Sequence, residues 1–379
     1  MEFKLILKKI EGTLSPEEQI IFDNWYLQSQ RHRDYFHRVT QMKQPIGDID
    51  TLKAYEKISK RLYRRKPSKL YYKIAAAALL LILISLPFVT NKNNQKFPPS
   101  TNEITKPSQT PILIGTDKAV LTLEDGSEIA LEKDANFQNN YANSNGKELV
   151  YTSSSKNNNT SSIAYNTLSI PRGGQFYIVL SDGTKVWLNS ETKLKYPVTF
   201  SLTTTRKVEL VYGEAYFEVS PSTMNQGQGF TVITQGQEVE VLGTQFNIKA
   251  YQDDNYIATT LVEGKVRIVG EQTSIQLQPG MQSKQDINSS KIQSLHVDIY
   301  NEISWKEGFF SFKNKPLKDI VKQLSRWYNI DIEIHNEKAA ELEFNGVFNK
   351  HQKLENILNI IENTNEAKFE KKGTKIIMK

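Results

Sequence analysis

The sequence of 379 residues contains no cysteine. Its absence excludes disulfide bonds, thiolate nucleophiles and cysteine-ligated zinc sites. Histidine is also scarce, and no two histidines have the i, i+4 spacing of a metal pair on one helix face. The five are His32, His37, His296, His335 and His351. We therefore expect no metal and no cofactor, and a fold that core packing alone holds together.

Sequence motifs of common enzyme classes are missing as well. The chain has no G-x-S-x-G, no G-x-x-x-x-G-K-[ST] and no H-E-x-x-H. Asp125 and Asp182 each precede a glycine, but no D-x-[DN]-x-[DN]-G calcium loop surrounds them, so turn chemistry explains both. This inventory predicts a protein that is not an enzyme.

Long uncharged runs are rare, and one stands out. Residues 74–89, IAAAALLLILISLPFV, contain no charged side chain, and Tyr71 and Tyr72 precede them as an interfacial aromatic pair. A signal peptide would begin the chain, whereas 73 residues precede this run. We predict one transmembrane helix over residues 71–90.

Charge is distributed unevenly around that run. Residues 1–73 hold 16 Lys plus Arg against 9 Asp plus Glu, a net charge of +7, and the remaining residues carry −1. Because Lys and Arg are retained on the cytoplasmic side of a span, the N-terminal part is expected in the cytoplasm and the C-terminal part outside. The basic balance is then juxtamembrane and does not indicate nucleic-acid binding.

Periodicity divides the rest of the chain into domains. Residues 1–66 read as short helices, the clearest opening with a capping box at Ser15, Pro16 and Glu18. Residues 91–111 form a polar linker. Residues 112–300 read as short strands separated by tight turns, as in an antiparallel sandwich or a solenoid-like β domain. Residues 301–379 alternate strand, helix, strand, strand, helix, strand.

The predicted fold class is thus a multidomain membrane protein. It comprises a small all-α cytoplasmic domain, one transmembrane helix, an all-β antiparallel domain and a C-terminal α+β domain. Within the β domain, residues 120–131 and 178–188 share the pattern L-x-D-G-[ST]-x-[IV]-x-L. Asp-Gly between alternating apolar runs predicts a hairpin with a type I′ turn in each copy.

Five ordered phrases carry a family resemblance. They are PRGGQFYIVLSDGTKVWLNSETKLKYP, RKVELVYGEAYFEV, FTVITQGQEVEVLGTQFNIKAY, TTLVEGKVRI and LQPGMQ, and they begin at residues 171, 206, 230, 259 and 277. Together they resemble the β region of FecR-type membrane anti-sigma factors. The later WKEGFFSFKNKPLKDIVKQLSRWYNIDIEI, FNGVFN and LENILNII are similar to the C-terminal domain of Bacteroidetes members, which resembles the secretin and TonB short N-terminal fold.

The resemblance implies a transmembrane signalling function. A TonB-dependent outer-membrane receptor would present a periplasmic signalling domain to residues 301–379, and the chain, in the inner membrane, would sequester or deliver an extracytoplasmic-function sigma factor. Regulated cleavage also belongs to the family. In some members a Gly-Thr bond cleaves itself when the Thr hydroxyl attacks the preceding carbonyl, and Gly243 and Thr244 match that bond, although a tight turn explains the same pair.

The predicted partner sites consist of aromatic side chains. Phe22, Trp25, Tyr35 and Phe36 are expected to bind the sigma factor. Trp305, Phe310, Trp327 and Tyr328 are expected to dock the receptor. The alternative hypothesis is a single-span periplasmic ligand-binding or envelope interaction protein. The sequence leaves open whether the imported nutrient is an iron chelate or a glycan.

Overall fold

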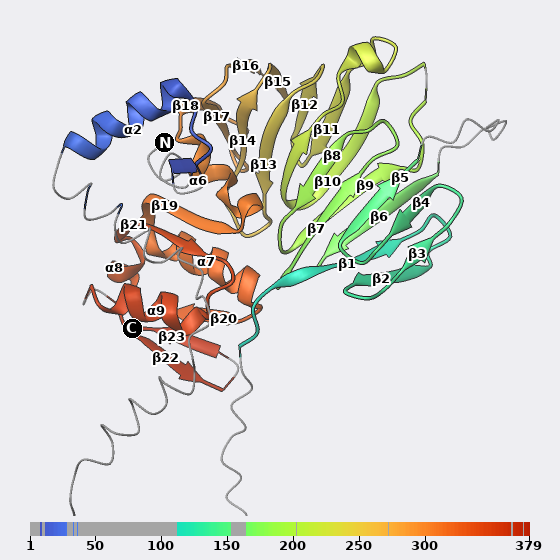
Figure 1. Ribbon diagram of the computed structural model, residues 1–379. Coiled ribbons are helices and arrows are strands. Elements are labelled where there is room, and N and C mark those ends of the chain that lie inside the picture. The colour runs from blue at the N-terminus through green and yellow to red at the C-terminus, as the bar shows by residue number, and fades with distance from the viewer. Residues whose placement is uncertain are drawn as a thin grey trace, which may run out of the picture. The chain divides into compact units, whose positions relative to one another are not determined.

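The structure of the chain is a computed structural model, shown in Figure 1. It describes residues 8–9, 12–28, 33, 36, 112–152, 164–201, 203–271, 273–364, 367–373 and 375–379. The chain divides into two compact units, Met1–Lys106 and Pro107–Lys379. The predicted span at 71–90 and the linker at 91–111 lie outside the described residues. None of the helices in the described ranges combines the length and the apolar character that crossing a bilayer requires.

The described part of the first unit contains helix α2 (Pro16–Gln28). The Ser15 hydroxyl accepts a hydrogen bond from the Glu18 amide at 3.2 Å, and the Glu18 carboxylate accepts one from the Ser15 amide at 3.1 Å. This reciprocal pair is the predicted capping box, which satisfies two donors that a helix start otherwise leaves open. The prediction of the helix start is confirmed.

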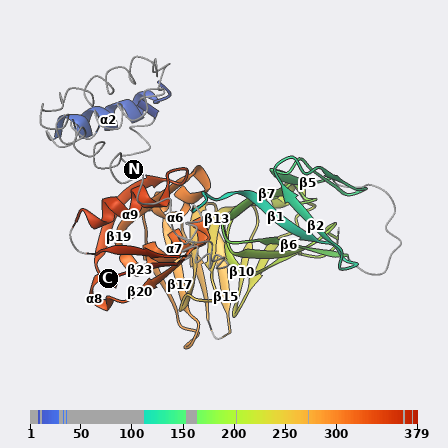
Figure 2. The same cartoon turned by 90° about the horizontal axis from the view of Figure 1, so that it is seen from below.

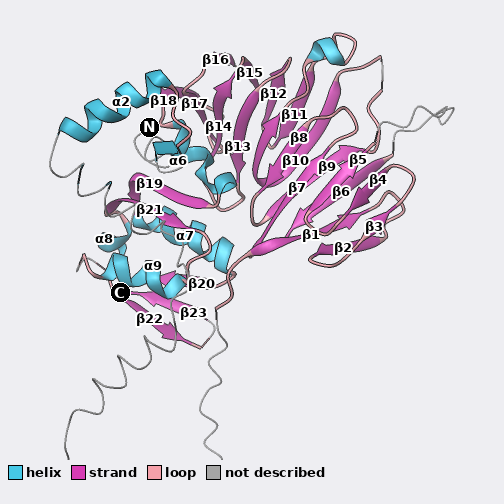
Figure 3. Cartoon of the chain, in the orientation of Figure 1, coloured by secondary structure: helices cyan, strands magenta, loops and turns pink. Residues whose placement is uncertain are grey.

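Strands dominate the second unit (Figure 3). They are β1 (Thr116–Thr122), β2 (Glu128–Glu132), β3 (Phe137–Gln138), β4 (Ala142–Ser144), β5 (Glu148–Tyr151), β6 (Tyr165–Ile170), β7 (Gly174–Val179), β8 (Lys185–Leu188), β9 (Thr192–Pro197), β10 (Arg206–Glu218), β11 (Phe230–Thr234), β12 (Gln237–Val241), β13 (Gln245–Ala250), β14 (Tyr256–Glu263), β15 (Val266–Gly270), β16 (Ser274–Leu277), β17 (Met281–Asp286) and β18 (Ile292–His296). A 3-10 turn, η2 (Ser222–Met224), interrupts the return from β10 to β11.

The long strand β10 belongs to two sheets. Its first half pairs with β9 and β11, and its second half, from Gly213 onward, pairs with β8 and β13. Gly213 has a φ of 102°, a conformation that favours glycine, where the strand passes from one sheet to the other. Both sheets contribute to one buried apolar cluster that includes Leu121, Phe217 and Phe246. In Figure 2 strands of the two sheets lie in separate layers.

The two Asp-Gly repeats form the same hairpin turn. In the first, Gly126 has a φ of 83° and its amide donates to the Leu123 carbonyl at 3.0 Å, while Leu123 donates to Ser127. Gly183 and Leu180 repeat this arrangement. The hairpins are confirmed, but the predicted type I′ turn is wrong, because only the glycine of each pair has a positive φ.

The Asp side chain explains that difference. Asp125 accepts hydrogen bonds from the Ser127 amide and hydroxyl at 2.9 and 2.6 Å. Asp182 accepts the same two bonds from Thr184 at 2.9 and 2.7 Å. This local bonding holds each Asp at negative φ and leaves the glycine alone in the left-handed region.

The C-terminal domain follows β18. Its elements are α6 (Ile299–Ile303), η3 (Ser304–Glu307), β19 (Phe309–Pro316), α7 (Leu317–Tyr328), β20 (Asp331–Ile334), α8 (Glu337–Ala340), β21 (Glu343–Asn349), α9 (Leu354–Glu362), β22 (Phe369–Lys372) and β23 (Lys375–Met378). Strands β19 and β21 form one sheet, and β20, β23 and β22 form another in that order. Helices α7 and α9 match the two helices predicted within residues 301–379. The last predicted strand is instead a pair of strands, β22 and β23.

The predicted fold class is wrong. The described residues are mostly strand, they contain no membrane-spanning helix, and within 1–66 they show no all-α domain. The antiparallel class also fails, because β10 pairs with β11 in parallel, as β7 does with β1 and β5. The physical reason for the β10–β11 pair is that residues 219–229 carry the chain back along β10, so that Phe230 lies beside Arg206.

A buried ion pair ties one hairpin to that parallel pair. The Arg206 guanidinium lies 2.6 Å from the Asp182 carboxylate, and the two side chains are 1% and 2% exposed. Arg206 also donates to the carbonyls of Ser220 and Gln228 at 3.1 and 3.0 Å. These bonds join the β7–β8 turn, the start of β10 and the loop before β11.

We expect Arg206→Met to lower the free energy of unfolding by about 3–5 kcal/mol, because it leaves the Asp182 carboxylate buried without its partner. Arg267→Met is the matched control, since Arg267 pairs with Glu240 at 3.5 Å and is 62% exposed. We expect Arg267→Met to lower the free energy of unfolding by only about 0–1 kcal/mol. Urea unfolding of both variants measures the difference, and equal midpoints would contradict the assigned role of Arg206.

Candidate functional site

The loop between β6 and β7 caps a helix of the C-terminal domain. Arg172 donates to the carbonyls of Ser325 and Ile330 at 3.1 and 2.8 Å, and its guanidinium pairs with Asp331 at 2.7 Å. The Gly173 amide donates to the Arg326 carbonyl at 2.7 Å. The carbonyls of Ser325 and Arg326 belong to the last turn of α7. The Ser325 carbonyl also accepts from the amides of Asn329 and Ile330, whereas the Arg326 carbonyl has no helical amide left to bond. A cation also suits this negative end of the helix dipole.

Arg326 points from α7 back to the β domain. Its side chain is 7% exposed and pairs with Glu191 at 3.2 Å and with Asp253. Its guanidinium lies 3.7 Å from the centre of the Tyr251 ring. Burial raises the pKa of the Tyr251 phenol well above its ordinary value, so this ring stays neutral. Arg326 is therefore fixed by charges and an aromatic face that the β domain supplies.

Lys350, which follows β21, is buried at the same junction. It is 1% exposed, its ammonium donates to the Gln175 side chain at 2.9 Å, and it lies 3.7 Å from the centre of the Trp327 ring. Burial lowers the pKa of this ammonium to about 7, although the carboxylates of Glu214 and Asp117 oppose that shift. A lysine held in this way is costly to keep charged.

A second lysine binds to an aromatic pair of the β domain. Lys306, in η3, lies 4.8 and 4.5 Å from the ring centres of Trp187 and Tyr216. Its ammonium is 3.9 Å from the Glu218 carboxylate. We call the contacts of Arg172, Gly173, Arg326, Lys350 and Lys306 across the two domains the joint. The sequence at Arg172–Gln175 predicts no more than a turn that enters a strand.

The predicted receptor-docking residues lie in the interior. Trp305, Phe310, Trp327 and Tyr328 are each no more than 3% exposed. Trp327 donates to the Lys350 carbonyl at 2.9 Å, and Tyr328 donates to the Gln352 carbonyl at 2.7 Å. In this conformation their side chains form the domain core and the joint. Their docking role stays a prediction.

The predicted sigma-binding residues are described in part. Phe22 is 3% exposed, and its ring centre lies 5.8 Å from that of Tyr26 and 5.2 Å from that of Phe36. The side chain of Trp25 and the whole of Tyr35 lie outside the described residues. Ile20 and Leu27, seven residues apart on α2, are 63% and 71% exposed and are not among the residues predicted from the sequence to bind the sigma factor.

The Gly243–Thr244 bond lies between β12 and β13. Gly243 has a φ of 152°, and a Cβ there would lie 2.9 Å from the Pro221 Cα. The Thr244 hydroxyl donates to the Lys265 carbonyl at 2.9 Å, which leaves the oxygen lone pairs free. The pair forms a constrained turn with a nucleophile beside the bond, and self-cleavage stays a prediction.

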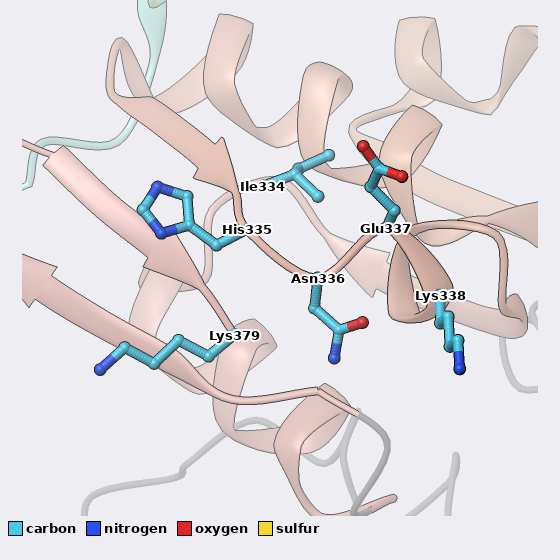
Figure 4. Close-up of a pocket in the computed structure, with 6 residues that line it drawn as sticks. All are labelled: Ile334, His335, Asn336, Glu337, Lys338 and Lys379. Atoms are coloured by element: carbon cyan, nitrogen blue, oxygen red, sulfur yellow. The ribbon is translucent and has the colours of Figure 1, made fainter.

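One hollow of the second unit is open and lies beside β20, where His335, Asn336, Glu337 and Lys338 point in different directions (Figure 4). Another lies at the joint, between Glu214, Trp305 and Gln323 among others, and its volume of about 20 Å³ suits one water molecule. Within the described ranges, no three His, Asp or Glu side chains gather to hold a metal ion.

Comparisons with known proteins match both halves of the joint. A family model described as FecR protein matches residues 166–267, and one described as FecR, C-terminal, matches residues 309–378. The chain contains a FecR domain and a FecR C-terminal domain. The FecR match begins in β6, so it includes the capping loop, and the FecR C-terminal match includes α7 and Lys350.

Two solved structures are similar to part of the chain. They are crystal structures, at 1.65 and 2.50 Å resolution, of a candidate anti-sigma factor from Parabacteroides distasonis ATCC 8503. Each is 29% identical, covers 56% of this chain, is itself covered over 98% of its length, and has a TM-score of 0.52. No curated protein matches the sequence.

We expect Lys350→Met to raise the free energy of unfolding at pH 7 by about 1–4 kcal/mol, because an apolar side chain of similar length removes a buried charge. An unfolded lysine keeps its proton up to about pH 10.5, whereas Lys350 in the fold loses it near pH 7. Over that window the unfolded state binds more protons, so the wild type gains stability as the pH rises.

The advantage of Lys350→Met should therefore shrink between pH 7 and 10, as measured by denaturant unfolding at several pH values. Lys318→Met is the control, since Lys318 forms an exposed pair with Glu341. A constant difference between wild type and Lys350→Met would contradict the shifted titration of Lys350.

Self-cleavage at Gly243–Thr244 has a direct test. It requires a hydroxyl at 244, so Thr244→Ser is expected to keep it and Thr244→Ala to abolish it. Mass spectrometry of the chain from cells would show fragments ending at 243 and beginning at 244. A wild-type chain that stays whole removes the idea.

Proposed function

We propose that this chain is an anti-sigma factor that transmits a signal to an extracytoplasmic-function sigma factor. Its N-terminal part would hold the sigma factor, and its C-terminal domain would receive the signalling domain of a TonB-dependent receptor. The chain would act by binding rather than by catalysis. The matches to the two FecR family models and the similarity to a candidate anti-sigma factor support this function.

The proposed location is the inner membrane, with the N-terminal part in the cytoplasm and residues 112–379 in the periplasm. The support is the uncharged run 74–89 and the charge of +7 ahead of it, both features of the sequence.

The observation that carries the transducer role is the joint. A domain that receives a partner can affect the rest of the chain only through its contacts with it. The C-terminal domain contacts the β domain through the last turn of α7, which Arg172 and Gly173 complete. A partner that moves this domain must break those bonds, so its docking would change the contacts of the β domain.

For the sigma-binding side, the exposed positions on α2 are the natural candidates. Phe22 packs against Tyr26 and Phe36, whereas Ile20 and Leu27 present apolar surface to solvent. A sigma factor would therefore be expected to cover Ile20 and Leu27, while buried Phe22 and the rings that it contacts would hold the helix in place.

We expect Ile20→Glu and Leu27→Glu to weaken capture of the sigma factor by at least about tenfold, because each places a charge in an apolar contact while keeping a good helix former. Full-length chain is purified from its host, and mass spectrometry quantifies the sigma factor that accompanies it. Gln19→Glu is the control, since it adds the same charge beside Lys9 on a different face of α2.

Transcript profiling of the same variants reports the consequence in cells. De-repression of an operon that includes a receptor gene is expected for Ile20→Glu and Leu27→Glu, and not for Gln19→Glu. If no sigma factor accompanies the wild-type chain, the proposed function is wrong.

A further inference from the structure

The segment that leads into β1 lies against the C-terminal domain. Ile112 and Ile114 are half-buried and pack on the apolar cluster of that domain, while Leu113 between them is 73% exposed. Figure 1 shows the chain reaching β1 beside the C-terminal elements. The apolar cover of residues 112–115 is thus provided by a domain some 200 residues later in the sequence.

Trp327 excludes any side chain at Gly115. A Cβ at this position would lie 2.6 Å from the Cδ2 and Cε3 atoms of Trp327, closer than carbon atoms can approach. Gly115 has no positive φ, so space and not backbone conformation requires the glycine. Trp327 cannot easily yield, because it is 2% exposed and its Nε1 donates to the Lys350 carbonyl.

Backbone hydrogen bonds attach the same segment to α7. The Thr116 amide donates to the Gly173 carbonyl at 3.0 Å, and the Gly173 amide donates to the Arg326 carbonyl at 2.7 Å. The Gly115 contact and the Gly173 bond therefore end on Trp327 and Arg326, two neighbouring residues of α7. If α7 moves, both are lost together, whereas the bond between Thr116 and Gly173 lies within the β domain.

We propose that residues 112–115 are a strap, which the C-terminal domain holds closed through Trp327 and which opens when a partner displaces that domain. The strap directly follows the segment that leads to the N-terminal part of the chain. Opening would turn a packed segment into an extended, accessible one just ahead of β1. The regulatory meaning of this strap rests on the proposed function, whereas its mechanics do not.

The test uses full-length protein without any partner. Gly115→Ala forces a methyl group against Trp327, so amide exchange over residues 112–118 is expected to rise by about tenfold or more, with new protease cuts in the same segment. Gly229→Ala is the matched control, because a Cβ there meets only ordinary contacts at 3.5 and 3.7 Å.

Two further variants separate strap opening from general unfolding. Ile114→Ala removes apolar contact without adding a wedge and should raise exchange in the same segment, but less. In a Trp327→Leu background, Gly115→Ala should change amide exchange over residues 112–118 much less, because the added methyl group no longer meets the Trp327 ring. If Gly115→Ala loses amide-exchange protection throughout the β domain, the result for Ile114→Ala alone decides whether the strap opens locally.

The strap is overturned if neither Gly115→Ala nor Ile114→Ala raises exchange at residues 112–118 above Gly229→Ala. In cells, both strap variants should activate the sigma-dependent operon without an inducer. Opening in the purified protein with a silent operon would overturn the regulatory role. A chain that binds no sigma factor would defeat the proposed function and leave the exchange result unaffected.

Discussion

The last turn of α7 depends on hydrogen-bond donors from another domain. An α-helix ends with four carbonyls that have no helical partner, and burying them unsatisfied is costly. Asn329 adopts the left-handed conformation, and its amide and that of Ile330 both donate to the Ser325 carbonyl. Arg172 adds donors to the carbonyls of Ser325 and Ile330, and Gly173 supplies the donor to Arg326. The Arg326 carbonyl, in the last turn of the longest helix of the C-terminal domain, thus receives this donor only when that domain is docked.

The composition of the joint suits docking that can be reversed. The C-terminal domain contributes three basic side chains, Arg326, Lys306 and Lys350. The β domain contributes their partners, which are Glu191, Glu218 and the side-chain amide of Gln175. Desolvating these groups offsets most of what their pairing contributes, so such an interface is specific without being strongly stabilising. Polar interfaces of this kind between domains of one chain permit relative motion. A partner of ordinary affinity could then compete with the joint.

Local chemistry was the part of the fold that the sequence predicted well. The capping box needs Ser15 and Glu18 three residues apart, and each DG hairpin needs a turn between two short runs, so each signal lies within one window. The turn type escaped prediction because the Asp side chain, rather than the Asp backbone, bonds to Ser127 or Thr184. The fold class failed for a non-local reason, since the parallel β10–β11 pair depends on where an eleven-residue return places the chain.

The joint was invisible to sequence reasoning because its partners lie far apart. Arg172 and Ser325 are 153 positions apart, and Gln175 and Lys350 are 175. Aromatic character at Trp305 and Trp327 suggested a docking surface, but the same large apolar rings also favour burial, and the structure places them inside.

Two glycines lie at the end of α7, where the two domains meet. A residue that makes its contact through backbone atoms can usually carry any side chain. The exception is a position where the neighbouring domain lies so close that no Cβ fits. Gly173 has a φ of 70°, and a Cβ there would press on Asn329 at 3.3 Å, while Gly115 lies under the Trp327 ring. Where the backbone of one domain packs closely against a side chain of the other, the position therefore requires glycine, because glycine has no Cβ. Because both glycines contact the end of α7, the strap and the capping loop meet at one helix terminus, and movement there would be felt by both.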